Sequence, residues 1–221
     1  MTNRPRYSRI ADDESDGIET LDAYYKSLGR FVHTFAKVEF TVFLVLRHYA
    51  KVSLDAARAL LTGIRADQAQ GMLQRLREVE LIDQAAWEDA DRVLQQFSEI
   101  NKFRNDLLHD TTILSETGRG VVTNAGKALH AGRLEQSLVS PDILDNATFD
   151  LRKITTQLNV KHMGNPDFGD PKVEALLRAP WRYKRQSSPP VESLQREPLD
   201  HTRTPVRKSP PKRPRPALPT E

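Results

Sequence analysis

Residues 21–49, LDAYYKSLGRFVHTFAKVEFTVFLVLRHY, carry the pattern that decides the fold. Apolar or aromatic side chains recur there at alternating steps of three and four residues: Leu21, Tyr24, Leu28, Phe31, Phe35, Val38, Val42, Val45 and Tyr49. This spacing places them on one face of an α-helix, whereas a half-buried strand would alternate with period two. We therefore predict one helix over residues 18–50, roughly 50 Å long at 1.5 Å per residue.

A second set of apolar residues, Phe40, Phe43, Leu44 and Leu46, lies on another side of the same predicted helix. A helix that is apolar on two sides is buried on two sides. We expect a neighbouring helix of the same chain to cover one side and a second copy of the chain to cover the other. The face at residues 40–46 is accordingly the candidate surface for a homodimer.

The rest of the chain predicts several shorter helices and one irregular insertion. Helical spacing and cap residues predict the following: a short helix after Ser53, residues 65–81, residues 84–109 after Asp83, residues 141–161 after Ser140, and residues 171–178. Residues 111–126, TTILSETGRGVVTNAG, hold β-branched residues around two glycines, which is typical of a small hairpin or a loop. We predict an all-α fold, a four- to five-helix antiparallel bundle with that hairpin or loop as an insertion.

Composition divides the chain into four regions. We expect a flexible N-terminus at residues 1–17, a helical domain at 18–164, a peripheral segment at 165–186 and a disordered tail rich in Pro, Arg and Lys at 187–221. The tail holds nine prolines and few apolar residues. It contains seven basic and four acidic residues, so its charge equals the +3 of the whole chain. The folded part is therefore neutral, and its composition is not that of a strongly basic nucleic-acid binder.

Two absences bear on the compartment. The chain has no cysteine, which excludes disulfides and thiolate metal sites and is compatible with a reducing cytoplasm. The N-terminus has no apolar stretch of the kind that a signal peptide needs, and the longest apolar run, FTVFLVL at 40–46, is too short to span a bilayer. We expect a soluble, cytoplasmic protein.

Polar residues gather at the end of the predicted helix 84–109, in the stretch EINKFRNDLLHD at residues 99–110. Arg104 and His109 are five positions apart, which rotates them by about 140° and separates them by about 7.5 Å along the axis, so they diverge. Asn105 and His109 are four apart and share a face. The guanidinium and the imidazole can share one site only if the helix ends or bends between them, or if two copies of the segment face each other.

These residue types suit the cleavage of RNA without a metal. The reaction needs the ribose 2′-hydroxyl to attack the adjacent phosphate, and a histidine can move the protons near neutral pH. A guanidinium can hold the phosphate oxygens through paired hydrogen bonds while charge builds on them. An asparagine can hold the phosphate or orient the histidine.

The stretch FRNDLLH resembles the signature of the HEPN superfamily (higher eukaryotes and prokaryotes nucleotide-binding). In that signature an arginine, a polar residue, a short spacer and a histidine lie near the end of a late helix in a four- or five-helix bundle. FAKVEFTVFLVL also resembles the first helix of the family, with Glu39 in an otherwise apolar run. The resemblance covers residues 18–162. Asp110, directly after the histidine, departs from the small residue often found there.

The resemblance implies a metal-independent endoribonuclease with a composite active site, to which both subunits of a homodimer contribute Arg and His. Many members act as toxins or defence effectors held in check by an antitoxin protein. Arg104, Asn105 and His109 match the motif and are the expected catalytic residues, and Lys102 is a candidate contact to the RNA backbone. No cofactor and no metal are expected. For Glu39 we expect a polar contact with another helix, with Arg104 as the candidate partner.

Other interpretations stay open. Some members of the family have lost cleavage and serve as RNA-binding or scaffold modules. A structural or regulatory helical dimer would explain the same residues as a solvated helix end, where cations suit the helix dipole. The basic tail, 201–216, is equally compatible with RNA attraction, with a polyproline segment that binds a partner, and with a passive role.

Overall fold

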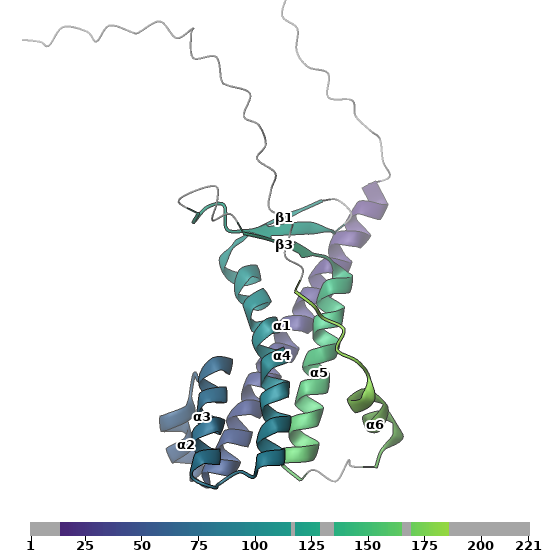
Figure 1. The fold of residues 1–221 in the computed structure, drawn as a ribbon. Coiled ribbons are helices and arrows are strands. Elements are labelled where there is room, and N and C mark those ends of the chain that lie inside the picture. Colours follow the sequence, from purple (N-terminus) through teal and green to yellow (C-terminus); the bar gives the residue numbers. More distant parts are fainter. Residues whose placement is uncertain (1–13, 116–117, 129–134, 165–168, 186–221) are drawn as a thin grey trace, which may run out of the picture. The chain divides into compact units, whose positions relative to one another are not determined.

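The computed structural model describes residues 14–115, 118–128, 135–164 and 169–185 of the chain, with side chains from residue 21 onward. Within these residues the chain is mainly helical, and three long helices lie side by side in Figure 1. The helices are α1 (Glu14–Ala50), α2 (Leu54–Leu61), α3 (Ala66–Glu78), α4 (Gln84–His109), α5 (Pro141–His162) and α6 (Pro171–Arg178). The predicted tail at 187–221 and most of the predicted flexible N-terminus lie outside the described residues.

The predicted helix boundaries agree with the observed ones at most positions. Ser53, Asp83 and Ser140 each accept a hydrogen bond from a backbone amide in the first turn of the helix that follows, as expected of N-cap residues. The main error is at the start of α1, which begins at Glu14, four residues before the predicted boundary. Those four residues were predicted as part of the flexible N-terminus, and they are helical.

Helix α1 is central to the core because it packs extensively on α5 and also contacts α2 and α3. It carries three small buried residues spaced by seven, Ser27, Thr34 and Thr41, and small side chains let helix backbones approach closely. Aromatic rings fill the space towards α4. The ring centroids of Phe35 and Phe97 are 5.0 Å apart, which joins the middle of α1 to the middle of α4.

The predicted helical fold is confirmed as mainly α, but a pure all-α bundle is not, because the insertion is a three-stranded antiparallel sheet. Its strands, β1 (Thr111–Leu114), β2 (Gly120–Thr123) and β3 (Gln136–Val139), pair in sequence order and lie at one end of the helices in Figure 1. The predicted hairpin corresponds to β1 and β2, with Leu114 opposite Gly120. At Gly120 a Cβ atom would lie 2.2 Å from the carbonyl oxygen of Ile113, so only glycine fits. Strand β3 has four residues, too few to show a clear alternation.

The peripheral segment is tied to the helices by a buried carboxylate. Asp150 on α5 accepts hydrogen bonds from the backbone amides of Arg182 and Tyr183, at 3.0 and 2.8 Å, and from the side chain of Gln96 on α4. Burial raises the pKa of Asp150, although these hydrogen bonds oppose the shift. The segment after α6 therefore runs along α4 and α5 and ends beside the sheet. In the described part of the chain, no helix has an apolar stretch long enough to cross a bilayer.

Candidate functional site

The motif residues lie on the last two turns of α4, as the sequence predicts. Phe97, Ile100 and Phe103 are buried and fix the rotation of the helix against the core. Arg104 and Asn105 are consequently half-buried at the edge of the core, and His109 is exposed as the final helical residue.

Arg104 is held against α1. Its guanidinium carbon lies 5.3 Å from the centroid of the Phe35 ring, and Nη1 donates a hydrogen bond to the side-chain oxygen of Asn105 at 3.0 Å. A cation over an aromatic face is attracted by the negative face of the ring. The aromatic ring and the amide together orient the guanidinium. Within the described residues, Asn105 is its only side-chain hydrogen-bond partner.

His109 does not meet Arg104 within one chain. Helix α4 is continuous to His109, so the two side chains keep the divergence that their spacing predicts. Asn105 lies between them, because it bonds to Arg104 and shares a helix face with His109. A single protomer therefore brings Arg104 and Asn105 together and leaves the imidazole of His109 on the adjoining surface.

The end of α4 is fixed by contacts with the sheet region. Lys127 donates hydrogen bonds to the backbone carbonyl of His109 and to the carboxylate of Asp110, the latter at 2.9 Å. Asp106 accepts a hydrogen bond from Arg185 at 3.1 Å and lies 3.5 Å from the hydroxyl of Ser137. Burial raises the pKa of Asp106, and the nearby Asp110 and Glu135 add to the effect, although Arg185 opposes it.

Two further predicted contacts have different outcomes. Glu39 is exposed and makes no ion pair with Arg104 among the described residues, so that expectation was wrong. Its position on α1 faces the groove towards α2 instead. Lys102 is exposed, as a contact to RNA requires, but it pairs with Glu99 at 2.5 Å on the same helix. Its charge is therefore partly offset.

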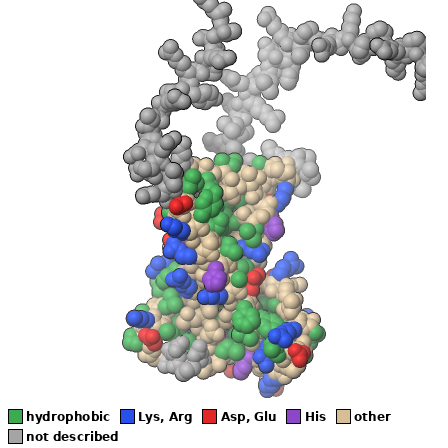
Figure 2. All heavy atoms as spheres, turned by 180° about the vertical axis from the view of Figure 1, so that it is seen from behind, with side chains coloured by type: hydrophobic (Ala, Val, Ile, Leu, Met, Phe, Trp, Pro, Cys, Tyr) green, Lys and Arg blue, Asp and Glu red, His purple; other side chains and the backbone are tan. Residues whose placement is uncertain are grey.

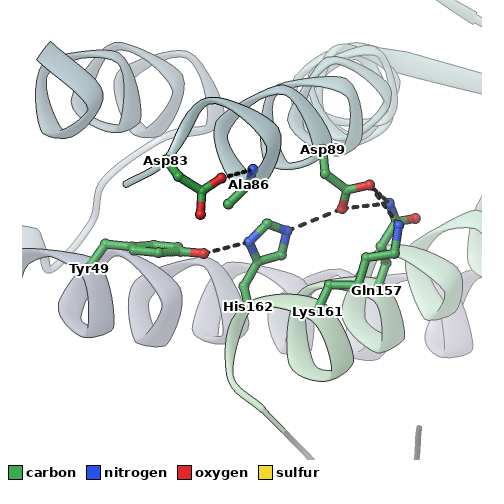
Figure 3. Close-up of polar contacts among 7 residues, drawn as sticks. All are labelled: Tyr49, Asp83, Ala86, Asp89, Gln157, Lys161 and His162. Atoms are coloured by element: carbon green, nitrogen blue, oxygen red, sulfur yellow. Dashed lines mark hydrogen bonds and ion pairs between the residues drawn. The ribbon is translucent and has the colours of Figure 1, made fainter. Parts of the chain in front are cut away.

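A second polar cluster, which sequence reasoning missed, joins α1, α4 and α5 near the other end of α4 (Figure 3). The hydroxyl of Tyr49 lies 2.9 Å from Nδ1 of His162, and Nε2 of His162 lies 3.2 Å from the carboxylate of Asp89. Gln157 and Lys161 also donate to Asp89, at 2.9 and 2.7 Å. These partners are far apart in the sequence, so no local motif predicts their contact.

The Tyr49–His162–Asp89 cluster places a hydroxyl, an imidazole and a carboxylate in the order of a catalytic triad. Its burial between helices, however, favours a structural role. The side chain of His162 is only 1% exposed, and both of its ring nitrogens have partners. Burial raises the pKa of Tyr49, and the nearby Asp83 and Asp89 raise it further, so its phenolate is a scarce nucleophile. A substrate atom would have to displace a packed contact to reach this cluster.

Elsewhere on the surface of the described residues lie two concave regions. One is a groove of about 580 Å³ between the C-terminal half of α1 and α2. The other, about 500 Å³, has a mostly polar lining around Gln96 and Trp181. Neither is lined by Arg104, Asn105 or His109. The described residues include no group of three or more His, Cys, Asp or Glu side chains arranged to hold a metal ion.

Comparison with known proteins finds no relative: no protein-family model matches the chain, and neither the curated proteins nor the solved structures provide a significant match.

Proposed function

We propose that the protein is a metal-independent endoribonuclease that acts as a homodimer, with Arg104, Asn105 and His109 as its catalytic residues. The observation that carries this proposal is the orientation of Arg104 by Phe35 and Asn105, next to an exposed histidine on the same helix end. A guanidinium oriented before substrate arrives stabilises developing charge without reorganisation. The resemblance of FRNDLLH to the HEPN signature supports the same residues.

The reaction assigned to these groups is an internal transesterification. One His109 imidazole takes the proton of the ribose 2′-hydroxyl, and the oxygen attacks the adjacent phosphorus. The bond from phosphorus to the 5′-oxygen breaks, and the imidazolium of a second His109 protonates the leaving oxygen. Arg104 stabilises the charge on the phosphoryl oxygens, and Asn105 keeps the guanidinium in place. The products carry a 2′,3′-cyclic phosphate and a 5′-hydroxyl.

A second copy of the chain is part of this proposal for a geometric reason. Each protomer presents Arg104 and His109 on diverging sides of α4, away from the two grooves described above. Two protomers related by a two-fold axis would supply two guanidinium and two imidazole groups to one cleft. The guanidinium and the imidazole of a single chain then need not converge.

The test is cleavage of mixed RNA in the presence of EDTA. We expect His109→Ala to lower the cleavage rate by about 10²- to 10⁴-fold, the usual contribution of a positioned acid or base. We expect Arg104→Lys to lower it by about 10²-fold, because an ammonium cannot reproduce the planar fork of donors. His48→Ala is the matched control, since His48 is also an exposed histidine near a helix end.

Three outcomes separate this proposal from its rivals. Equal cleavage by the wild type and by His109→Ala would overturn the assignment. RNA that is retained on a filter but never cleaved would identify a binding module instead. Growth arrest on expression of the wild type, and its absence with His109→Ala, would support the toxin form of the proposal.

A further inference from the structure

Helix α1 has an exposed apolar stripe on a side that no other helix of the described residues covers. Tyr25, Val32 and Phe40 are 60%, 42% and 61% exposed, and Gly29 and Ala36 lie between them on the same face. Single exposed apolar residues are common on protein surfaces, but a row along one helix marks an interaction surface. Figure 2 views the molecule from behind relative to Figure 1 and shows patches of hydrophobic side chains on this side, with Lys, Arg and His among them.

The C-terminal half of this stripe runs into the groove between α1 and α2. Apolar side chains form much of its lining, and the rings of Phe40 and Phe43 stack there with their centroids 6.2 Å apart. Arg47, Arg58 and Arg65 also line the groove, against a single acidic residue, Glu39. The surface therefore suits an occupant that is apolar on one face and acidic at its edges.

The sequence of the N-terminal part of α1 supplies acidic residues of this kind. From Glu14 to Asp22 the sequence of the helix contains four acidic residues and no basic one, and the exposed apolar stripe begins directly after it at Tyr25. Asp22 is exposed. One end of α1 is thus acidic, and the groove at its other end is basic.

We propose that α1 pairs antiparallel with α1 of a second copy, so that the acidic end of each helix lies in the basic groove of the other. A two-fold axis makes the surface self-complementary, which satisfies both grooves at once. Asp22 then lies close to Arg47 of the partner subunit. Tyr25 packs on Phe43 of the partner subunit, and the two copies of the stripe cover each other along its length.

The middle of the pairing has room for close approach. Val32 faces Ala36 of the partner subunit, and Gly29 faces Glu39 of the partner subunit. A Cβ atom added to Gly29 would meet nothing within 4 Å in the protomer, so the glycine leaves an open space on the helix surface. Phe40 of the partner subunit, next to its Glu39, fills that space.

The α1 pairing also bears on the proposed nuclease site. This part of the inference rests on the proposed function. Phe35 lies in the same turn of α1 as Val32 and Ala36, but its side chain is buried against Phe97 of α4, where it carries the guanidinium of Arg104. A two-fold axis at this turn of α1 places the two copies of Arg104 at the same level along the paired helices. The separation between the two guanidinium groups is then set by how α1 pairs.

Because the chain contains no cysteine, disulfide cross-linking of the full-length protein gives a direct test. The double variant Gly29→Cys/Glu39→Cys should form a covalent dimer on oxidation. Within one chain the two positions are about 15 Å apart along the helix, too far for a disulfide. Each single variant should stay uncross-linked, because antiparallel pairing keeps its two copies apart. Efficient cross-linking of either single variant, or failure of the double variant, would overturn the register.

Sedimentation equilibrium tests the same surface without cross-links. We expect a dimer for the wild type and at least a tenfold weaker association for Gly29→Gln. The unfolding temperature of the Gly29→Gln protomer should be no lower than that of the wild-type protomer. Asp22→Arg should weaken association about tenfold, and the reversal Asp22→Arg/Arg47→Asp should restore it. A wild-type chain that stays monomeric at every concentration would overturn the proposal and leave the groove to a different acidic partner.

The failures of the two proposals are distinguishable. A cross-linked dimer that cleaves no RNA would overturn the nuclease and leave the pairing in place. Cleavage by monomeric Gly29→Gln at the wild-type rate would overturn the composite site.

Discussion

The two ends of α4 each carry a histidine close by, and the two histidines differ in almost every physical respect. His162 is enclosed by Tyr49 and Asp89, and both of its ring nitrogens have partners on other helices. His109 is exposed, and within the described residues its ring makes no hydrogen bond. The enclosed ring can join helices but cannot meet a substrate, whereas the exposed ring can meet a substrate and contributes little to the fold.

The two histidines show that a set of groups suited to catalysis indicates an active site only where a substrate can reach it. Tyr49, His162 and Asp89 form the more complete array, yet burial closes it. The groups around His109 form a less complete array in one chain, yet they lie open beside an oriented guanidinium. The open end around His109 is therefore the proposed place of the chemistry, and the enclosed end around His162 is the proposed source of stability.

The largest effect on stability is expected from His162→Ala. This change removes two hydrogen bonds, leaves a void and deprives Asp89 of one partner, so unfolding free energy should fall by about 3 kcal/mol. His109→Ala is the matched control, and an exposed histidine should change the same quantity by less than about 0.5 kcal/mol. Urea unfolding of both variants measures the difference. Equal losses would show that the two ends are not distinct in the way proposed.

The pH dependence of stability sharpens the same contrast. Burial alone would raise the pKa of Asp89, but hydrogen bonds from His162, Lys161 and Gln157 and the charge of Lys161 together hold it well below its usual range. A lowered folded-state pKa contributes stability that is present above the unfolded value, about 3.9, and is lost as the pH falls through the folded value. The stabilising contribution of the Asp89 carboxylate should therefore decrease in acid.

The measurement is a comparison of the wild type with Asp89→Asn, whose side chain does not titrate. Between pH 5 and pH 2 the stability advantage of the wild type should shrink by on the order of 2 kcal/mol. Asp106 and Asp150 have raised pKa values in both proteins, so their opposite contributions cancel in the difference. A constant gap over this range would show that Asp89 is not stabilised as an anion.

The long helices could be predicted because their determinants are local. The repeat along α1 and the cap residues Ser53, Asp83 and Ser140 act within a few turns of the backbone, and their interpretation needed little correction. Strand β3 could not be predicted in the same way. It is four residues long and owes its conformation to pairing with β2, a partner that precedes it by more than a dozen residues.

In the candidate site, too, some features follow from the local sequence and others depend on how the helices pack. The positions of Arg104, Asn105 and His109 at the end of a helix followed from the local pattern. The support of the guanidinium by Phe35 depends on how α1 packs on α4, which no local pattern specifies. The Asp89–His162 contact spans 73 positions of the sequence, so only the fold brings these residues together.

The smallest predicted effect concerns Lys127, which joins the end of α4 to the turn after β2. Its ammonium group donates to the carbonyl of His109 and to Asp110, but its side chain is largely exposed, so Lys127→Met should lower unfolding free energy by only about 0.5 kcal/mol. The cleavage rate should fall by less than tenfold, because Asp106 and the buried face of α4 still hold the helix end. The same urea and cleavage assays measure both quantities. A loss of cleavage as large as that of His109→Ala, at unchanged stability, would instead place Lys127 among the groups that act on the phosphate.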